Sequence, residues 1–489
     1  MPTFLTSSFL LAILGVLLGP SSATWAAATT KPNFVIILID DMGYGDVGPF
    51  GSLLNRTPNL DRMATEGMRL TSFYAAPVCT PSRAQMMTGC YAKRVSMPDV
   101  IFPSCPTGLG AKEHTVAALL KRQGYATMAI GKWHLGDQPE FLPTRRGFDH
   151  YLGLPYSNDM GGPTRPTAKE ATKKNKKDPD AQPRPPLPLL RDGKVIEAPA
   201  NQDALTTRYT EEAVKFITAN RSRPFFLYLP HTAVHVPLHP GPAFKNKSAN
   251  GRYGDWVEEV DWSVGRVLNT LRDLKLAERT LVLFTSDNGP WLTQGTNGGI
   301  AGPLHGGKGT TWEGGMREPT IAWWPGKIPA HSVCDALVSE VDVLPTLVKL
   351  AGGKVPADRK IDGKDIWPLL SCQTTISPHD ALFYFNSRKL EAVRSGPWKL
   401  AIAPQGTGLP KEAAEPVKHT GPRLYNLDTD IGELTDVAAQ HPDVVARLQR
   451  FVDEMNADLG VVGDGPGVRP PGRVAKPRPL LKRVGIEYD

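Results

Sequence analysis

The sequence predicts an α/β fold, in which helices flank a large, mostly parallel sheet, followed by a smaller C-terminal domain of antiparallel sheet plus helix. Past Cys372, short alternating segments divided by Gly and Pro favour the antiparallel sheet. At 489 residues the chain is longer than one hydrophobic core usually supports, so two domains are expected. The large sheet is predicted from four apolar runs, each typical of a strand covered on both faces, at 33–39, 125–130, 224–229 and 280–286.

The first residues indicate export. An apolar run over 9–19 is too short to span a bilayer, and small residues follow it through Ala28, as in a cleaved signal. We therefore expect a signal peptide over 1–28 and a protein that is secreted, periplasmic or lysosome-like. An uncleaved anchor is the alternative, because no Lys or Arg precedes the run. No later segment approaches transmembrane length, so none is expected after signal cleavage.

The overall charge is positive, with a net charge of +7 and a pI near 9.0. This balance suits polyanionic substrates but does not require them, because much of the excess lies in loops and in the tail. No nucleic-acid partner is expected. Cys90 and Cys105 are the nearest pair for a disulfide in an exported chain, and buried thiols are the alternative.

Two predicted strands end in oxygen-bearing side chains. The strand 33–39 runs into Asp40 and Asp41, and ligands collect at the carboxyl ends of strands in open α/β sheets. Two adjacent carboxylates repel each other, and a hard divalent cation compensates them most simply. A helix-capping Asp pair in a turn is the alternative. The strand 280–286 ends in Asp287-Asn288, which would supply further oxygen ligands.

The segment 79–89 predicts a helix that opens at a cysteine. Cys79 stands just ahead of Pro81, which suits a first helical turn, and good helix formers follow. A helix N-terminus favours a bound anion or a thiolate of low pKa, and Arg83 can point its guanidinium at the same place. A buried structural cysteine is the alternative. Other helices are predicted at about 58–67, 113–124, 211–219 and 256–274, with a short strand near 69–74.

Charged and imidazole side chains follow two other predicted strands. The strand 125–130 leads into Lys132 and His134, which lie two apart on a Gly-flanked loop and can face one cavity. Exposed loop charges are the alternative. The strand 224–229 is followed by His231, His235 and His239, which are spaced four residues apart. On a helix this spacing would suggest a zinc site, but the prolines among the three histidines argue against a helix.

A glycine-rich stretch surrounds Lys308. The glycines of 306–315 permit close approach of the backbone, so Lys308 can reach an anion. A nucleotide-binding P-loop is excluded, because the glycines before this lysine have the wrong spacing.

These stretches together resemble the type I sulfatases, the arylsulfatase-like, formylglycine-dependent branch of the alkaline phosphatase superfamily. The signature Cys-x-Pro-Ser-Arg, followed four residues further on by Thr-Gly at 88–89, lies at 79–89, and six separated elements keep the family's order between about 32 and 460. The resemblance implies an alkaline-phosphatase-like mixed sheet. It also implies an arylsulfatase-like sulfuric ester hydrolase.

The resemblance implies a modified residue and a metal ion. In that family the cysteine is oxidised to Cα-formylglycine by a formylglycine-generating enzyme, whose recognition sequence would here include Pro81 and Arg83. The hydrated aldehyde, a gem-diol, is the nucleophile. The implied ion is Ca²⁺, with Mg²⁺ less expected, and oxygen-only ligands favour both over zinc. Its implied ligands are Asp40, Asp41, Asp287, Asn288 and an oxygen of modified Cys79.

The same resemblance selects His235 over its two neighbours and assigns the remaining roles. Lys132 contacts substrate and aldehyde, Ser157 binds a sulfate oxygen or the diol, and His134 takes the diol's proton. His235, with Lys308 nearby, protonates the leaving oxygen. Arg83 and the two lysines neutralise the sulfuryl oxygens. The implied catalytic set is Cys79, Arg83, Lys132, His134, His235 and Lys308, and the implied substrate-binding set is Ser157, Lys132, His235 and Lys308.

The expected substrates are sulfate monoesters, with aryl sulfates as laboratory substrates and a sulfated small molecule or carbohydrate in nature. Two alternatives remain. A phosphomonoester or phosphonate hydrolase can share the fold, and a non-catalytic glycan-binding relative would keep it with an unconverted thiol. The paired Lys132 and Lys308 favour sulfate, and the full set of polar groups favours an enzyme.

The predicted domain organisation has three parts. A signal peptide covers 1–28, the sulfatase catalytic domain 29–371, and the C-terminal domain with its basic tail 372–489. Strands near 382–385, 390–394 and 398–402 should pack against a helix over 442–459. The composition of 163–200 predicts a mobile surface loop. Specificity is expected in the loops 97–110, 157–200 and 290–305.

Overall fold

The computed structural model describes residues 1–3, 31–162, 185–407 and 421–481. The predicted signal peptide over 1–28 therefore lies almost wholly outside the described residues, as does the most basic part of the predicted 163–200 loop. Within the described ranges, no helix is both long and apolar enough to cross a membrane.

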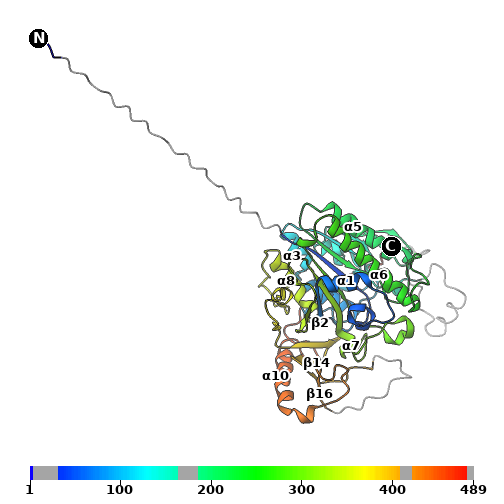
Figure 1. Ribbon diagram of the computed structural model, residues 1–489. Coiled ribbons are helices and arrows are strands. Elements are labelled where there is room, and N and C mark those ends of the chain that lie inside the picture. Colours follow the sequence, from blue (N-terminus) through cyan, green and yellow to red (C-terminus); the bar gives the residue numbers. More distant parts are fainter. Residues whose placement is uncertain (4–30, 163–184, 408–420, 482–489) are drawn as a thin grey trace. The chain divides into compact units, whose positions relative to one another are not determined.

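Among the described residues from 31 onward, a mixed sheet of 11 strands lies at the centre, which confirms the predicted α/β class (Figure 1). Its middle is parallel, in the order β9 (Thr280–Ser286), β1 (Asn33–Ile39), β8 (Phe225–Pro230), β4 (Ala126–Ile130) and β5 (His150–Gly153). Antiparallel strands extend one side, with β10 (Arg317–Trp323) between β9 and β2 (Met68–Tyr74). The short β11 (Ser332–Cys334) and β12 (Val338–Ser339) run parallel to β2.

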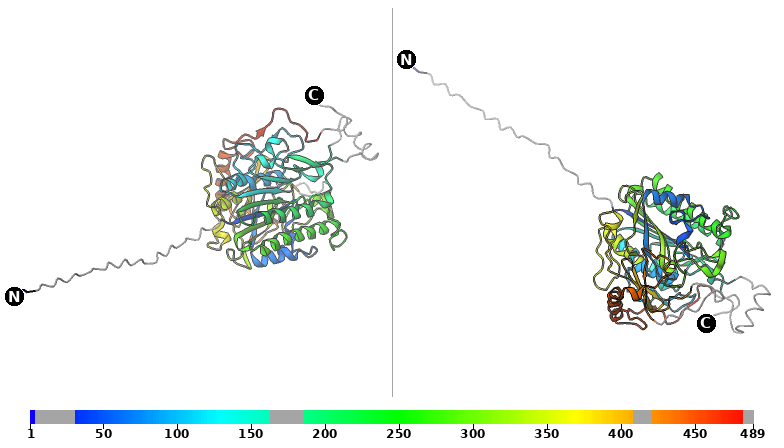
Figure 2. Two further views of the ribbon diagram at one scale, coloured as in Figure 1. Left: turned by 90° about the horizontal axis from the view of Figure 1, so that it is seen from above. Right: turned by 60° about the horizontal axis from the view of Figure 1, so that its bottom comes forward.

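Helices cover both faces of this sheet. Alternate residues of β1 belong to two different cores, as expected of a strand buried on both sides. One core packs α1 (Pro58–Glu66), α5 (Leu205–Ala219) and α6 (Gly251–Asp273), and Figures 1 and 2 show the last two side by side. The other core packs α2 (Cys79–Thr88), α3 (Val116–Arg122), α8 (Val343–Leu350) and the short α9 (Trp367–Leu370).

The register of the parallel strands brings the predicted site residues to one edge. Ile39 of β1 pairs with Ser286 of β9, so the residues after each strand emerge side by side. Leu38 pairs with Pro230 of β8, and the Pro230 carbonyl accepts a hydrogen bond of 2.8 Å from the Lys132 N–H. The ends of β1, β9, β8 and β4 therefore meet at the carboxyl edge, where ligands bind in such sheets.

The predicted strands are confirmed to within a residue or two, whereas several helices differ at their starts. The helix predicted from 113 begins at Val116, because Thr115 caps it by accepting a hydrogen bond from the Ala118 N–H. α5 and α6 begin at Leu205 and Gly251, five or more residues earlier than predicted. In α5 the earlier start adds buried Leu205 and Tyr209 to the apolar face.

The prediction of a surface loop over 163–200 is wrong for its last part. β6 (Leu189–Arg191) and β7 (Lys194–Glu197) form a hairpin that extends the main sheet beyond β5. The turn between them is Asp192-Gly193, with φ of 49° and 85°. Two residues with positive φ make the tight turn that best joins antiparallel strands, and Asp-Gly is a typical sequence for it.

The C-terminal part forms the predicted antiparallel sheet plus helix. The strands β13 (Leu382–Asn386), β14 (Lys389–Ser395), β15 (Trp398–Ala401) and β16 (Arg423–Asn426) lie in chain order, with α10 (Pro442–Asp458) packed on them. Figure 1 shows α10, in orange, beside β14 and β16. The helix buries Leu448 and Val452 against the sheet.

The chain then returns to the larger sheet's neighbourhood. β17 (Gly472–Arg473) pairs with β3 (Thr107–Gly108), and Arg469 bonds Glu113 at 2.8 Å. By its contacts, 31–489 forms one compact unit, so the predicted division at 371 and 372 stays a prediction.

Candidate active site

Cys79 is the first residue of α2, as predicted, and is buried against the end of β1. Its Sγ donates to Asp40 Oδ1 at 3.3 Å. The prediction of a low thiol pKa is wrong, because burial and the neighbouring Asp40 carboxylate raise the pKa of Cys79 far above its usual value. These effects outweigh the helix N-terminus and the nearby lysines. An unmodified thiol here would be neutral and a poor nucleophile.

The two oxygen-bearing pairs at the strand ends do converge. Asp287 Oδ1 accepts a 3.3 Å hydrogen bond from the Asp41 N–H, and Asn288 Nδ2 donates to Asp41 Oδ1 at 2.8 Å. Asp41 has a φ of 62°, an unfavourable conformation for a residue other than glycine and one that occurs often at functional sites. Candidate ligand atoms of Asp40, Asp41, Cys79 and His235 lie within 4.8 Å of one another.

This group of side chains fits a hard cation. All four carboxylate and amide side chains are buried, and the Asn288 Oδ1 has no hydrogen-bond partner among the described residues. A buried carbonyl oxygen without a partner costs free energy, which an oxygen-seeking ion would recover. Burial and the adjacent Asp40 raise the pKa of Asp287 to about 6, although Arg83 opposes this. A cation would relieve the same crowding of carboxylates.

Asp40, Asp41, Cys79, Asp287 and Asn288, with the side chains that contact them, form one cluster. Two lysines enter this cluster from different loops. Lys132 Nζ lies 2.6 Å from Asp40 Oδ2 and Lys308 Nζ lies 2.7 Å from Asp41. Despite burial, Lys132 and the cations around it hold the pKa of Asp40 far below its usual range. Burial opposes the charge of Lys308, but Asp41 raises its pKa well above normal, so this ammonium stays protonated. Both lysines therefore present positive charge to an anion bound at the cluster.

Arg83 lies in the cluster, but its guanidinium is hydrogen-bonded to other groups of the protein. Nε and Nη2 donate to Asp287 Oδ2 at 2.9 and 2.7 Å, and Nη1 donates to the Lys132 carbonyl at 2.5 Å. The side chain is fully buried. This geometry suits the positioning of Asp287 and the Lys132 loop rather than contact with a substrate.

His134 has one ring nitrogen occupied and the other free. Nε2 lies 2.9 Å from the Ile101 carbonyl, which can only accept, so the proton sits on Nε2 and Nδ1 carries a lone pair. Nδ1 is buried and has no partner among the described residues. Burial, Lys132 and Arg83 lower the pKa of His134 well below its usual value. The ring is therefore neutral and able to accept a proton at Nδ1.

His235 and Ser157 complete the cluster. His235 Nδ1 donates to the Val236 carbonyl at 2.6 Å, which leaves Nε2 to face Ser157 Oγ at 3.4 Å and Asp41 Oδ2 at 3.6 Å. Ser157 Oγ also accepts from Lys132 Nζ at 3.3 Å. Burial and Lys308 lower the pKa of His235, with Asp41 opposing, and an anion bound nearby would raise the pKa again.

The other two histidines and the remaining cysteines lie outside the cluster. His231 Nε2 is 3.2 Å from Ser263 Oγ, and His239 Nδ1 is 2.8 Å from Asp203. All five cysteines, each within the described ranges, are free thiols, so the Cys90–Cys105 disulfide is not formed.

Sequence reasoning did not find three residues that contact the cluster. Ser286 Oγ accepts from the Met42 N–H at 3.0 Å, and Thr80 Oγ1 donates to the His134 carbonyl at 3.0 Å. Trp291 contacts both His235 and Lys308. Each stands within four residues of a predicted site residue, and Trp291 also lies in the loop 290–305, where specificity is expected.

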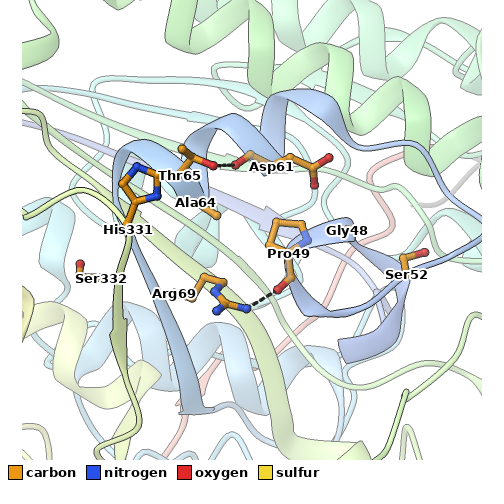
Figure 3. Close-up of a pocket in the computed structure, with 9 residues that line it drawn as sticks. All are labelled: Gly48, Pro49, Ser52, Asp61, Ala64, Thr65, Arg69, His331 and Ser332. Atoms are coloured by element: carbon orange, nitrogen blue, oxygen red, sulfur yellow. Dashed lines mark hydrogen bonds between the residues drawn. The ribbon is translucent and has the colours of Figure 1, made fainter.

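A separate hollow of about 520 Å³ lies beside α1 and β2 (Figure 3). Arg69 and His331 line it, and Arg69 donates to the Pro49 carbonyl at 2.7 Å. None of the predicted site residues lines this hollow, so it is distinct from the cluster.

Comparison with known proteins agrees with this fold and cluster. The Sulfatase family model matches residues 32–353, and the model for the C-terminal region of aryl-sulfatase matches 377–465. Human arylsulfatase A is 40% identical over 452 residues, which cover 88% of each chain. N-acetylgalactosamine-6-sulfatase of Canis lupus familiaris is 42% identical over 400 residues, covering 76% of this chain and 72% of that protein.

Solved structures agree as well. The PsFucS1 sulfatase from Pseudoalteromonas sp. matches with a TM-score of 0.77 and 29% identity, covering 89% of this chain and 91% of that one. Because one family model spans well over half of the sequence and relatives at 40% identity align over most of their length, the chain belongs to the sulfatase family of sulfuric ester hydrolases.

Proposed function

We propose that this sulfatase cleaves sulfate monoesters of carbohydrates in nature and aryl sulfates in the laboratory, with Cα-formylglycine at position 79 and a bound Ca²⁺. The similarity to arylsulfatase A and to N-acetylgalactosamine-6-sulfatase supports the substrate class. The observation that carries the proposal is the meeting of Cys79, the carboxylates of Asp40 and Asp41, and two lysines in one buried cluster. Mg²⁺ is the less expected ion.

The burial of residue 79 supports its conversion to formylglycine. A buried thiol with a raised pKa is a poor nucleophile, and oxidation by a formylglycine-generating enzyme would replace it with a reactive aldehyde. Cys79, Pro81 and Arg83 are all buried in the folded chain, so the modifying enzyme must read them before folding. The hydrated aldehyde supplies two hydroxyl groups on one carbon, one to attack sulfur and one through which sulfate is released.

The cation would be held by Asp40, Asp41, Asp287, Asn288 and the modified residue 79. When bound, it supplies positive charge that neutralises sulfuryl oxygens and favours an ionised hydroxyl at residue 79. Arg83 acts by positioning, because it holds the Asp287 carboxylate and the Lys132 carbonyl in place.

The side chains around the cluster would bind the sulfate group and transfer protons. Lys132 and Ser157 bind sulfuryl oxygens, and Lys308 places its ammonium beside the leaving oxygen. His134 accepts a proton at its free Nδ1. The anionic substrate raises the pKa of His235 on binding, so that Nε2 donates a proton to the leaving alcohol.

The proposal also covers the localisation and the partners of the enzyme. The chain is exported by its N-terminal segment, and the mature enzyme is secreted, periplasmic or lysosome-like. Its partners are the modifying enzyme and a sulfated carbohydrate or small molecule.

Mass spectrometry of the peptide that contains residue 79 tests the proposal directly. We expect the mass of the aldehyde in active protein, and an unmodified thiol in fully active protein would contradict it. Cys79→Ala should remain folded and lose several orders of magnitude in kcat. Rates on 4-nitrophenyl sulfate and 4-nitrophenyl phosphate separate a sulfatase from a phosphoester hydrolase. Turnover of neither ester would favour the glycan-binding alternative.

A further inference from the structure

Trp291 is an aromatic side chain at the cluster to which no role has been assigned. Its ring centroid lies 5.3 Å from that of His235, and the two planes are tilted by 54°. Lys308 Nζ lies over the same ring, 4.3 Å from its centroid. The indole thus contacts both side chains that the proposed function places at the leaving oxygen.

The loop that carries Trp291 is fixed against the loop of Lys308. The Pro290 carbonyl accepts hydrogen bonds from the Lys308 N–H at 2.9 Å and from the Leu292 N–H at 3.0 Å. A Cβ on Gly307 would lie 2.5 Å from the Pro290 oxygen, so only glycine permits this approach. The indole is therefore held by backbone contacts as well as by its ring contacts.

Trp291 and Lys308 are both partly exposed, whereas His235 is buried. Trp291 therefore lies at the border of the cluster, next to solvent. Because the proposed function places His235 and Lys308 at the leaving oxygen, the group that this oxygen carries would lie beside these two side chains and hence beside the indole. A large rigid indole binds other flat rings with little loss of conformational entropy.

We propose that Trp291 forms the platform of a leaving-group subsite, on which the flat face of a ring stacks. An aryl ring and a pyranose ring both offer such a face, and the experiment below separates them. This inference rests on the proposed function, because His235 and Lys308 locate the leaving oxygen. It adds a preference for sulfate esters carried by a ring over esters of a flexible chain.

Steady-state kinetics on three sulfate esters tests the proposal: 4-nitrophenyl sulfate, a methyl pyranoside 6-sulfate and butyl sulfate. Trp291→Leu removes the flat face but keeps apolar bulk, and Trp291→Phe keeps a smaller face. We expect Trp291→Leu to raise KM about 2- to 10-fold for a ring ester, the range that an aromatic pair contributes. KM for butyl sulfate should stay within about 2-fold, and Trp291→Phe should restore most of the loss.

The outcomes are distinct. A raised KM for one ring ester alone supports the subsite and identifies the ring it takes. An unchanged KM for both ring esters overturns the inference. So does an equal fall in kcat on all three esters, because Trp291 would then act only by holding Lys308. Gln294→Ala, in the same loop, is the matched control and should match the wild type on every ester.

A binding measurement separates this inference from the proposed function. Calorimetric titration with 4-nitrophenol and with the unsulfated methyl pyranoside probes the subsite without turnover. Wild-type protein that hydrolyses no sulfate ester, yet binds one of these ligands through Trp291, would overturn the function and keep the subsite. Active protein whose Trp291→Leu variant binds both ligands as the wild type does would overturn the subsite alone.

Discussion

Removal of Lys399 should destabilise the protein, because this lysine neutralises two buried carboxylates. This side chain is fully buried on β15, and its Nζ lies 3.0 Å from Glu313 Oε1, 2.7 Å from Glu433 Oε1 and 2.8 Å from the Thr311 carbonyl. Arg394 approaches Glu313 at 3.5 Å. Lys399→Met keeps the length of the side chain, removes its charge and leaves Glu433 without a cation.

The magnitude follows from the burial of these charges. Removing one partner of a buried ion pair costs about 3–5 kcal/mol, because the other charge stays desolvated and unpaired. The compact unit spans residues 31–489. At about 2.1 cal mol⁻¹ K⁻¹ per residue, its unfolding entropy is about 1 kcal mol⁻¹ K⁻¹. Lys399→Met should therefore lower the melting temperature by about 3–5 °C.

Differential scanning fluorimetry of four proteins measures this effect: wild type, Lys399→Met, Lys399→Met with Glu433→Gln, and the exposed control Lys327→Met. The double variant should recover part of the loss, because the uncompensated carboxylate is gone. The control should change the melting temperature by less than about 1 °C. Equal melting of Lys399→Met and wild type, or further loss in the double variant, would refute the reasoning.

Three other changes give expected outcomes of different kinds. Chelation of divalent ions should abolish sulfate-ester turnover and lower the melting temperature, and Ca²⁺ should restore both better than Mg²⁺ does; activity that survives complete chelation would contradict a metal site. Burial raises the pKa of Glu259 to about 7 from 4.5, so the folded state holds this proton more tightly than the unfolded state, and stability falls as pH rises from about 4.5 to about 7. Glu259→Gln should therefore raise the free energy of unfolding by up to about 3 kcal/mol at pH 8 and far less at pH 4.5, and equal gains at both pH values in chemical denaturation would disprove this. His235→Ala should lower kcat/KM more for butyl sulfate than for 4-nitrophenyl sulfate, whose leaving group needs little protonation, and equal losses would remove His235 from that role.

The sequence predicts the sheet and the edge where the site forms, because both depend on local patterns. A continuous apolar run identifies a buried parallel strand, and the residue that ends the run is then placed at the sheet's carboxyl edge. Asp40 and Asp287 could be located in this way. The hairpin at 189–197 could also have been recognised from Asp192-Gly193, but the surrounding basic and Pro-rich composition suggested a loop instead.

The electrostatics of the site could not be predicted in the same way. A helix N-terminus lowers a thiol pKa in isolation, but for Cys79 the decisive factors are full burial and the Asp40 carboxylate, which comes from a strand 39 positions earlier. The ion pair of Glu313 and Lys399 likewise joins residues 86 positions apart. Such contacts depend on tertiary packing, and neither residue's local sequence predicts them.

The pairing of β17 with β3 connects residues 472–473 to the segment 96–108, which contains the Ile101 carbonyl that orients His134. The Ile101 carbonyl sets the tautomer of that imidazole, and the same segment is pinned by Ser96 Oγ, which donates to the Arg469 carbonyl at 2.6 Å. Trimming the carboxy terminus upstream of 469, or fusing a bulky tag in its place, would loosen the stretch around 96–108. Recombinant versions of this enzyme should therefore retain Arg469 and β17.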